Sequence, residues 1–320
     1  MRRVSTVLAV LLVAQLILTA GTWLGAGQAD GPKAQRLITL DKDEIETLRL
    51  TKGADDEGVR LERHDAGWRL PASDGYPAKA GKVENLVAEL AGIEPGLPVA
   101  SSAAAHGRFD LGSDGAQRRV VINEGQSNSA TLLIGKSAGT SRVYVRRADS
   151  DAVHEIRFAS WQASPDPANW FDTDRLQIPI QEVRRVELDG FNLVNKDDAG
   201  WAIEGAEPDG EVSTTSIREF VAKATQPTFD AVGQAGGPDR EPAAGYTVVT
   251  KDGSEHRFNY YSPEDGAAAL LVRSDQGWRY RVGSELFKAV RDVTPGRFVA
   301  TDGEGQSDRA GTGSRSGGSG

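Results

Sequence analysis

Apolar and polar residues alternate in the same way at two places far apart in the chain. In residues 45–50 and in residues 183–188, apolar side chains recur as they do in a half-buried strand after a short lead-in. Each segment is followed by a turn and by the tripeptide Ala-Gly-Trp, which ends at Trp68 and at Trp201. We expect a β-hairpin in each place, with both tryptophans buried in its core.

An amphipathic helix is predicted after each hairpin. Apolar residues occur at i, i+3, i+4 and i+7 in residues 83–90 and again in residues 217–224, which places them in one stripe on a helix. Residues 213–216 offer several hydroxyl side chains that can cap the second helix. A loop that contains Pro and Gly follows each helix, at 94–115 and at 227–245.

Strands return after each loop. Tyr260 and Tyr261 are adjacent on one of them, so one of the two should be exposed, because neighbouring strand residues point to opposite faces. Each half then closes with a short helical piece, at 158–162 and at 284–291. The expected strands are residues 119–123, 130–134, 142–146 and 153–156 in the first half, and 246–250, 256–261, 269–273 and 278–282 in the second.

The order and spacing of these elements indicate an internal duplication. Corresponding residues are 138 positions apart at the first strand, 133 at the two tryptophans, 134 in the helices and 127 at Val145 and Val272. Such slow drift is what differences in loop length produce. The predicted fold class is α+β, with two similar units of antiparallel β-hairpins and one packed helix each, preceded by an N-terminal transmembrane helix.

The N-terminus carries a membrane-targeting pattern. Arg2 and Arg3 precede an uncharged stretch that runs to Ala29, and its apolar part would span about 31 Å as a helix at about 1.5 Å per residue. We expect this part, Val4 to Leu24, to anchor the chain in a membrane. The C-terminal body would lie outside that membrane, because positive charges favour the cytoplasmic side. Cleavage as a signal peptide after Ala29 is the alternative.

The chain is expected to divide into five segments. The link between the two units contains Pro179 and no Gly- or Ser-rich stretch, so the units should pack as a stiff pair. The last 20 residues include 11 Gly or Ser and are expected to be disordered. The expected segments are a membrane anchor or signal peptide (1–29), a linker (30–39), α+β repeat 1 (40–171), α+β repeat 2 (172–300) and the tail (301–320).

Composition excludes several classes of protein. The 37 Lys and Arg against 46 Asp and Glu leave a net charge of -9, whereas a nucleic-acid-binding surface needs the opposite sign. The sequence contains no cysteine, which excludes disulfides, thiolate metal sites, cysteine nucleophiles and a lipidated N-terminal cysteine. We expect no nucleic-acid partner.

Motifs for catalysis are incomplete in this sequence. Gly-Lys-Ser at 135–137 matches the end of a phosphate-binding P-loop, but Ala130 stands where the motif requires Gly, and no helix pattern follows. We expect a hairpin turn there. His-Glu at 154–155 lacks the second histidine of a zinc protease, and no Gly-x-Ser-x-Gly elbow occurs. The four histidines are His64, His106, His154 and His256, of which His64 and His256 are expected to be solvent-facing strand residues.

Carboxylates cluster in three places. A glycosidase would need two of them facing one cleft, and the last cluster resembles a fragment of a calcium loop, but acidic turns are ordinary in a chain of this charge. The sequence therefore predicts no catalytic, cofactor-binding or metal-binding residue and no cofactor. The clusters are Asp41, Asp43, Glu44 and Glu46; Asp55, Asp56 and Glu57; and Asp172 and Asp174.

Aromatic side chains offer a different kind of chemistry, because an exposed aromatic can contact a glycan or a partner protein. The folded body contains five tryptophans. We expect a structural role for the two that end the Ala-Gly-Trp tripeptides. The five are Trp68, Trp161, Trp170, Trp201 and Trp278.

Several short stretches of packing and turn residues, taken with the apolar N-terminus, carry a family resemblance. They are residues 45–50, Gly67-Trp68-Arg69-Leu70, Tyr76-Pro77-Ala78, Lys82-Val83-Glu84-Asn85-Leu86, Arg108-Phe109-Asp110-Leu111, Leu132-Leu133-Ile134-Gly135-Lys136, Val143-Tyr144-Val145-Arg146, Asn169-Trp170-Phe171 and Arg175-Leu176. The chain resembles the bacterial DUF4340 family, whose members occur as membrane-anchored proteins of unassigned activity. The resemblance covers about residues 40–188 well and the second half weakly. It departs at 109–111, where family members typically show Tyr-Gly-Leu.

The resemblance implies an association with ABC-type transport systems, like the gliding-motility auxiliary components. We therefore expect a non-catalytic periplasmic protein, an auxiliary or scaffold subunit of a membrane-protein complex for transport or for the cell envelope. Its segment Val4 to Leu24 would span the bacterial inner (cytoplasmic) membrane once, with the C-terminal body in the periplasm. The groove between the units or an open sheet edge would receive the partner. The alternatives are a periplasmic glycan- or small-ligand-binding module, and an enzyme without a recognisable motif.

Overall fold

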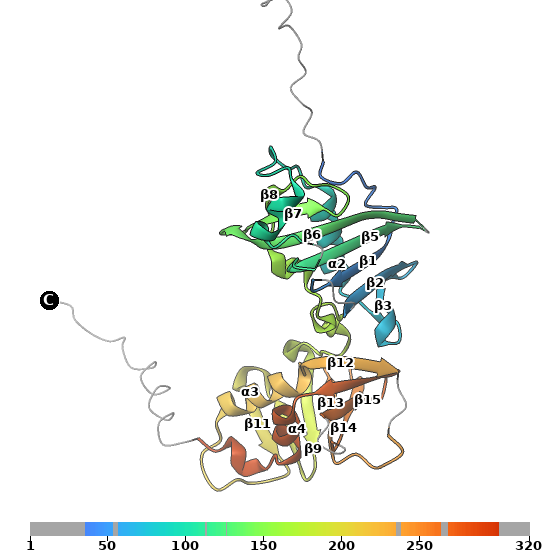
Figure 1. Ribbon diagram of the computed structural model, residues 1–320. Coiled ribbons are helices and arrows are strands. Elements are labelled where there is room, and N and C mark those ends of the chain that lie inside the picture. Colours follow the sequence, from blue (N-terminus) through green and yellow to red (C-terminus); the bar gives the residue numbers. More distant parts are fainter. Residues whose placement is uncertain are drawn as a thin grey trace, which may run out of the picture.

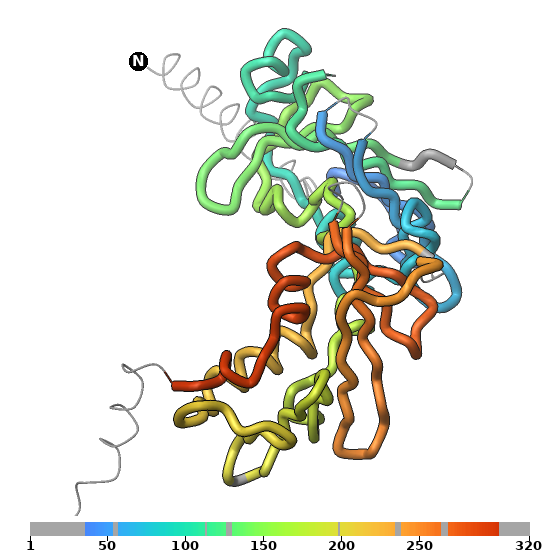
Figure 2. Tube along the Cα trace, turned by 90° about the horizontal axis from the view of Figure 1, so that it is seen from below, coloured from blue at the N-terminus to red at the C-terminus, as the bar shows by residue number. Residues whose placement is uncertain are grey.

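The computed structural model of the 320-residue chain describes residues 36–300, except 54–56, 113, 126, 235–237 and 264–267. Two β-rich bodies are stacked on each other, and the described chain begins at the top of the upper body and ends in the lower one (Figure 1 and Figure 2). The predicted anchor and tail lie outside the described residues. Within the described part, no helix combines the length and apolar character needed to cross a bilayer.

The upper body is built on an eight-stranded antiparallel sheet with the order β4-β3-β2-β1-β5-β6-β7-β8. Its strands are β1 (Ile45–Thr51), β2 (Gly58–His64), β3 (Gly67–Leu70), β4 (Tyr76–Pro77), β5 (Arg118–Glu124), β6 (Ser127–Gly139), β7 (Arg142–Arg147) and β8 (His154–Arg157). The helix α2 (Ala80–Ala91) accompanies this sheet, with 3-10 turns η1 (Pro71–Ser73), η2 (Ala103–Phe109), η3 (Ser160–Ala163) and η4 (Pro167–Asn169).

The lower body is built on a second eight-stranded antiparallel sheet, with the order β11-β10-β9-β13-β14-β15-β16-β12. Its strands are β9 (Val183–Leu188), β10 (Phe191–Asn195), β11 (Trp201–Glu204), β12 (Phe229–Gln234), β13 (Ala244–Thr250), β14 (Glu255–Tyr261), β15 (Ala269–Arg273) and β16 (Trp278–Val282). The remaining elements are α3 (Thr214–Thr225), α4 (Ser284–Arg291), η5 (Thr173–Arg175), η6 (Ile180–Glu182), η7 (Asp197–Ala199) and η8 (Pro295–Phe298).

The two sheets have the same strand order once β4 and β12 are set aside. In chain order, β1, β2, β3, β5, β6, β7 and β8 correspond to β9, β10, β11, β13, β14, β15 and β16. We call residues 36–171 repeat 1 and residues 172–300 repeat 2. The predicted α+β class and the internal repeat are confirmed.

Hydrogen bonds outside the sheets repeat as well. The segment before each helix pairs with the end of its repeat, because Lys79 N–H donates to Trp170 O (2.9 Å) and Ser213 N–H donates to Phe298 O (2.8 Å). The residue directly before each of these donors forms an isolated β-bridge with the same segment, Ala78 with Phe171 and Val212 with Val299. Each repeat therefore closes on itself by the same main-chain contact.

The predicted hairpins proved to be three-stranded meanders. The Ala-Gly-Trp strand was expected to pair with the first strand, but β2 and β10 lie between them. Two-residue turns, at 65–66 and at 189–190, connect strands inside each meander. The strand β12 was also missed, since the whole of 227–245 was expected to be a loop.

The helices follow the predicted apolar stripes. Val83, Leu86, Val87 and Leu90 of α2 are buried, and so are the corresponding residues Ile217, Phe220, Val221 and Ala224 of α3. The Ser213 side chain caps α3 by accepting the Ser216 N–H at 3.2 Å. The short helical piece predicted at the end of each half is present, as the turn η3 in repeat 1 and as the α-helix α4 at the predicted residues 284–291 in repeat 2.

The burial of the aromatic residues confirms one prediction and corrects another. Trp68 and Trp201 are buried, at 3% and 5% exposure. Tyr260 and Tyr261 are both buried, so the prediction that one of them is exposed was wrong. Adjacent Val248 and Val249 on the neighbouring strand β13 are buried too. Because side chains alternate along a strand, this part of the sheet must be covered on both faces.

An aromatic cluster joins the two repeats. Tyr76 of β4 lies edge-on to Phe229, Trp278 and Tyr280 of repeat 2, with ring centroids 6.1, 5.0 and 6.1 Å away. Phe171 stacks on Phe229 at 5.5 Å. The apolar core is consequently continuous from one repeat to the other.

Polar contacts fix the link between the repeats. Arg273 donates from Nη1 to Leu176 O at 3.0 Å, and the Ile178 N–H donates to Thr225 O at 2.8 Å. Leu176 and Ile178 are buried. The link is thus packed against repeat 2 along its length, as a stiff connection requires.

Candidate functional site

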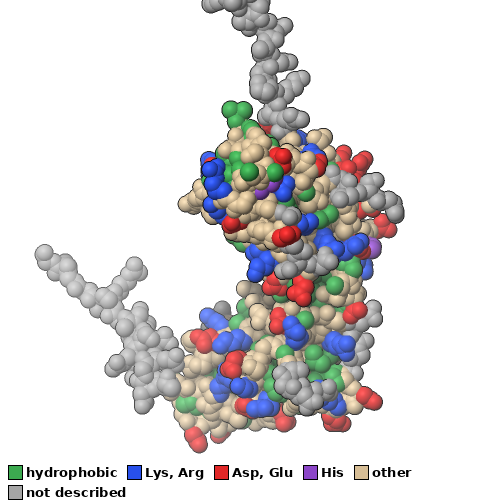
Figure 3. Space-filling view, viewed as in Figure 1, with side chains coloured by type: hydrophobic (Ala, Val, Ile, Leu, Met, Phe, Trp, Pro, Cys, Tyr) green, Lys and Arg blue, Asp and Glu red, His purple; other side chains and the backbone are tan. Residues whose placement is uncertain are grey.

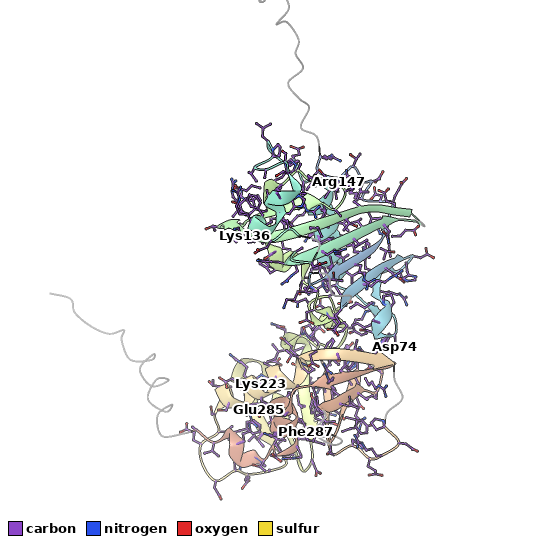
Figure 4. All side chains as sticks on the ribbon, in the orientation of Figure 1. Asp74, Lys136, Arg147, Lys223, Glu285 and Phe287 are labelled. Atoms are coloured by element: carbon purple, nitrogen blue, oxygen red, sulfur yellow. The ribbon has the colours of Figure 1, made fainter. Side chains whose placement is uncertain are left out.

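The Gly-Lys-Ser tripeptide at 135–137 lies inside the long strand β6, so the predicted hairpin turn was wrong. A Cβ on Gly135 would stand 2.1 Å from Phe109 O, which explains the glycine by close backbone approach. Lys136 lies on the strand of the upper body (Figure 4), with its Nζ 6.0 Å from the Phe109 ring centroid. The tripeptide serves packing, and it is not at a helix N-terminus that could hold phosphate.

The four histidines have four different environments. His64 is exposed on β2, as predicted, and His154 on β8 donates from Nδ1 to Gly96 O at 3.0 Å. His106 is buried in the turn η2 with Nε2 3.2 Å from Asp151 O. His256 departs from the predicted solvent-facing placement, since its side chain is only 21% exposed and pairs with Asp275.

The acidic clusters do not gather around an open site. In the first cluster, Asp41 Oδ1 accepts the Asp43 N–H at 2.9 Å, as in an ordinary turn. In the last, Asp172 pairs with Arg175 at 3.0 Å and Asp174 with Lys79 at 3.3 Å. Asp55 and Asp56 lie outside the described residues. Across the part of the chain that the structure describes, no three His, Asp or Glu side chains converge to hold a metal ion.

A hollow of 590 Å³ lies in repeat 1 beside an exposed tryptophan. Ile93, Ile156 and Phe158 line it and are almost fully buried, so they form an apolar floor. Trp161 of η3 adjoins the lining residue Gln162 and is 69% exposed. Among the described tryptophans, Trp68, Trp170 and Trp201 are buried and Trp278 is half-buried. Trp161 therefore stands out as an aromatic side chain that the fold itself does not use.

The rim of this hollow is polar and mixed in charge. Gln162 donates from Nε2 to Glu89 Oε1 at 2.7 Å, which links η3 to the C-terminal half of α2. Glu94 and Arg157 are exposed on the same rim. An apolar floor, a polar rim and a projecting aromatic residue are the features of a protein-binding hot spot.

A second hollow, of 480 Å³, lies in repeat 2 against the link between the repeats. His256 and Arg273 line it together with Lys251 and Asp252. The His256 Nδ1 lies 2.9 Å from Asp275 Oδ2, and Arg273 donates from Nε to Asp275 Oδ1 at 2.7 Å. Burial raises the pKa of Asp275, but the hydrogen bonds from Arg273 and His256 outweigh it and hold the pKa below its ordinary value.

Repeat 1 shows which part of this cluster the fold requires. By strand register Arg147 corresponds to Arg273, because Leu132 is opposite Arg147 as Phe258 is opposite Arg273. Arg147 donates from Nε to Asp149 Oδ1 at 2.8 Å, as Arg273 does to Asp275. The counterparts of His256 and Asp275, by strand register and matched main-chain hydrogen bonds, are Ala130 and Asp149. The same sheet thus folds without the histidine, whereas it keeps the arginine–carboxylate pair in both repeats.

Sequence reasoning named Trp161 only as one of five tryptophans, and it gave His256 no partner. One feature of the sequence is consistent with the exposure of Trp161, namely its two polar neighbours, Ser160 and Gln162. The His256–Asp275 pair could be found only from the register of β14 with β15. In that register Phe258 is opposite Arg273, which places His256 opposite Asp275 two residues further on.

Comparison with known proteins gives a family. No curated protein and no solved structure matches the chain. The sequence model described as a domain of unknown function (DUF4340) matches residues 68–240, from Trp68 on β3 through the joint to the loop after β12. This match covers more than half of the chain, and the protein therefore belongs to the DUF4340 family.

Proposed function

We propose that this protein is a non-catalytic, membrane-anchored module of the bacterial cell envelope that acts by protein–protein contact. In this proposal residues 4–24 hold it in the inner membrane, and the two repeats project into the periplasm. It serves there as an auxiliary or scaffold subunit of an ABC-type transport or envelope complex. The membrane attachment rests on the N-terminal sequence pattern, and the partner class rests on the family resemblance.

One observation carries the proposal of protein contact, namely the 69% exposed Trp161 beside an apolar-floored hollow. Leaving a tryptophan in water is unfavourable, since burial of a large aromatic side chain contributes about 1.5–3 kcal/mol. A partner that covers Trp161 would gain that energy at binding. Folding of the chain alone does not provide this burial energy, because Trp161 stays solvent-exposed in the folded protein.

Co-purification of the full chain from detergent-solubilised membranes tests this proposal. Trp161→Ser should lose the co-purified partner subunits, whereas Trp161→Phe, which keeps an aromatic ring, should retain them. Both variants should keep the thermal midpoint of the parent, because exposed positions change stability by about 0.5 kcal/mol or less. Equal recovery of partner subunits with Trp161→Ser would contradict the proposal.

A second candidate function is a small-ligand or glycan module at the hollow of repeat 2. The His256–Asp275 pair favours it, because repeat 1 keeps the carboxylate as Asp149 but has Ala130 in place of the histidine. In a neutral imidazole that donates from Nδ1 to the carboxylate, Nε2 remains an acceptor toward the hollow. Soluble peptidoglycan fragments should then raise the thermal midpoint of the parent and have no effect on His256→Ala. No rise in the parent would rule out this ligand class.

A further inference from the structure

The segment that follows the helix has a different task in each repeat. In repeat 2 it is the strand β12, which pairs with β16 and packs against η1 and η4 of repeat 1. Phe229 at its start stacks on Phe171. This segment is therefore the means by which repeat 2 is attached to the structure next to it.

The corresponding segment of repeat 1 occupies the same place beside its own last strand. Ala100 forms a bridge with Val153, immediately before β8, as Gly233 pairs with Arg279 of β16, which corresponds to Val153 by strand register. The separation of 133 positions between Ala100 and Gly233 differs by one from the 134 between the two helices. Residues 94–99, which we call the 94–99 loop, thus correspond to the attachment strand of repeat 2.

The 94–99 loop presents apolar side chains to solvent. Leu97 is 91% exposed and Val99 is 44% exposed, and with Trp161 they are the large apolar residues most exposed in the described chain. Hydrophobic side chains project at the upper end of repeat 1 in Figure 3, the end away from repeat 2. The loop therefore has the position of an attachment segment, but nothing in the described chain covers its tip.

Main-chain contacts hold the loop in a fixed form. His154 donates from Nδ1 to Gly96 O at 3.0 Å, and the Val99 N–H donates to Val153 O at 2.8 Å. Pro95 and Pro98 flank the tip and have no N–H to desolvate. Apart from Glu94 at its base, the loop is uncharged, so it can enter an apolar or interfacial environment without removing a charge from water.

A second copy of the chain does not offer the surface that receives β12. That surface includes Tyr76 and Phe171 of repeat 1. By the matched main-chain contacts before each helix and at each repeat's end, the counterparts in repeat 2 are Gly210 and Val299. The aromatic receptor is therefore absent from repeat 2, and stacking of copies end to end has no basis here.

The chain enters repeat 1 at the base of this loop. The Leu37 N–H donates to Ile93 O at 2.8 Å, directly before the loop begins. Only 12 residues separate Leu37 from the apolar N-terminal stretch that ends at Leu24, a reach of at most about 45 Å at about 3.5 Å per residue. A bilayer that holds the apolar N-terminal stretch would therefore lie within this reach of the 94–99 loop.

We propose that the 94–99 loop docks on the lipid bilayer, with Leu97 and Val99 inserted at the level of the headgroups. This inference rests on the proposed membrane attachment, and it adds an orientation. Repeat 1 would lie against the membrane surface and repeat 2 would point away from it. Leucine and valine side chains gain free energy at the interface, and the tether keeps them close enough to exploit it.

The absence of cysteine from the chain makes a direct test possible. Full-length Leu97→Cys is labelled with the fluorophore NBD and reconstituted into vesicles of phosphatidylethanolamine and phosphatidylglycerol, with or without nitroxide-labelled lipid. Glu285→Cys is the matched control, because its side chain is 88% exposed on α4 in repeat 2 (Figure 4). NBD at position 97 should shift to the blue and be quenched by the nitroxide lipid, while NBD at 285 should do neither.

Flotation of the vesicles separates this inference from the one on which it rests. A chain that does not float with the vesicles overturns both the attachment and the docking. A chain that floats, but whose NBD at 97 is as unquenched as at 285, overturns the docking alone. NBD at 97 that shifts only when native membrane proteins are added also overturns it, in favour of a protein partner. Val99→Cys gives an independent reading should Leu97→Cys fail to fold.

Discussion

The ring of Tyr76 in repeat 1 meets the ring of Trp278 in repeat 2 edge-on, with centroids 5.0 Å apart and planes at 83°. The Tyr76 hydroxyl donates to Asp172 O at 2.9 Å, at the start of the link between the repeats. Burial is the largest of the causes that raise the Tyr76 pKa, so the hydroxyl stays protonated and neutral. One side chain thus joins both repeats and the chain that connects them.

Tyr76→Ala should loosen this joint. Removal of a buried aromatic side chain costs about 3–5 kcal/mol, and Tyr76→Phe should cost only about 1 kcal/mol, for the lost hydrogen bond to Asp172. Limited proteolysis should then cut Tyr76→Ala within residues 172–180, which the parent protects. Tyr144→Ala is the control, since Tyr144 contacts Phe109 within repeat 1 and its loss should leave the link protected.

The three most informative tryptophans should respond differently to truncation. Trp68→Ala and Trp201→Ala should each lower the free energy of unfolding by about 3–5 kcal/mol, because both side chains are buried. Trp161→Ala should change it by about 0.5 kcal/mol or less. Denaturant titration measures all three. A Trp68→Ala variant as stable as the parent would show that the residue does not belong to the core.

Gly135 should not tolerate a side chain. A Cβ there would lie 2.1 Å from Phe109 O, so Gly135→Ala must displace the main chain of η2 and lower the thermal midpoint. Gly81→Ala in the first turn of α2 is the matched control, because a Cβ there meets no atom within 4 Å. It should stabilise the protein by about 0.5–1 kcal/mol through helix propensity. Equal midpoints for both variants would contradict the strand placement of Gly135.

Asp275 should stabilise repeat 2 in a pH-dependent way. Its pKa in the folded protein lies below the ordinary 3.8, so the charged carboxylate contributes stability above that value and loses it as the pH falls through the lower folded-state pKa. The difference in unfolding free energy between the parent and Asp275→Asn should therefore be constant at neutral pH and shrink below about pH 4. Since the side chain is 36% exposed, the effect should be about 1 kcal/mol or less. A difference that grows on acidification would reverse the assigned sign.

Local features of the fold could be predicted well from the sequence because each of them occurs once in each repeat. The stripes of α2 and α3 and the burial of Trp68 and Trp201 follow from spacing alone. The strand β12 was missed because Gly233 and a preceding Pro227 indicate a loop, and only its pairing with β16 stabilises an extended form. The local sequence does not indicate a pairing with a strand so far along the chain.

The candidate site was harder to predict for a related reason. Only the polar neighbours Ser160 and Gln162 distinguish Trp161 from the buried Trp170 in the sequence, because exposure depends on what the fold brings to cover each ring. His256 and Asp275 meet across a seven-residue connection at 262–268, and the length of such a connection does not fix the strand register. The chemistry-bearing contacts therefore appeared only with the tertiary structure.

Site-specific photo-crosslinking in intact membranes tests the central claim most directly. A benzophenone amino acid replaces Trp161 in one full-length variant and Glu285, on the exposed face of α4, in the other. The proposed function predicts adducts from position 161 with a subunit of an integral membrane complex, and none from position 285. Absence of adducts at 161, or the same adducts from both positions, would contradict the claim that repeat 1 holds a partner at Trp161.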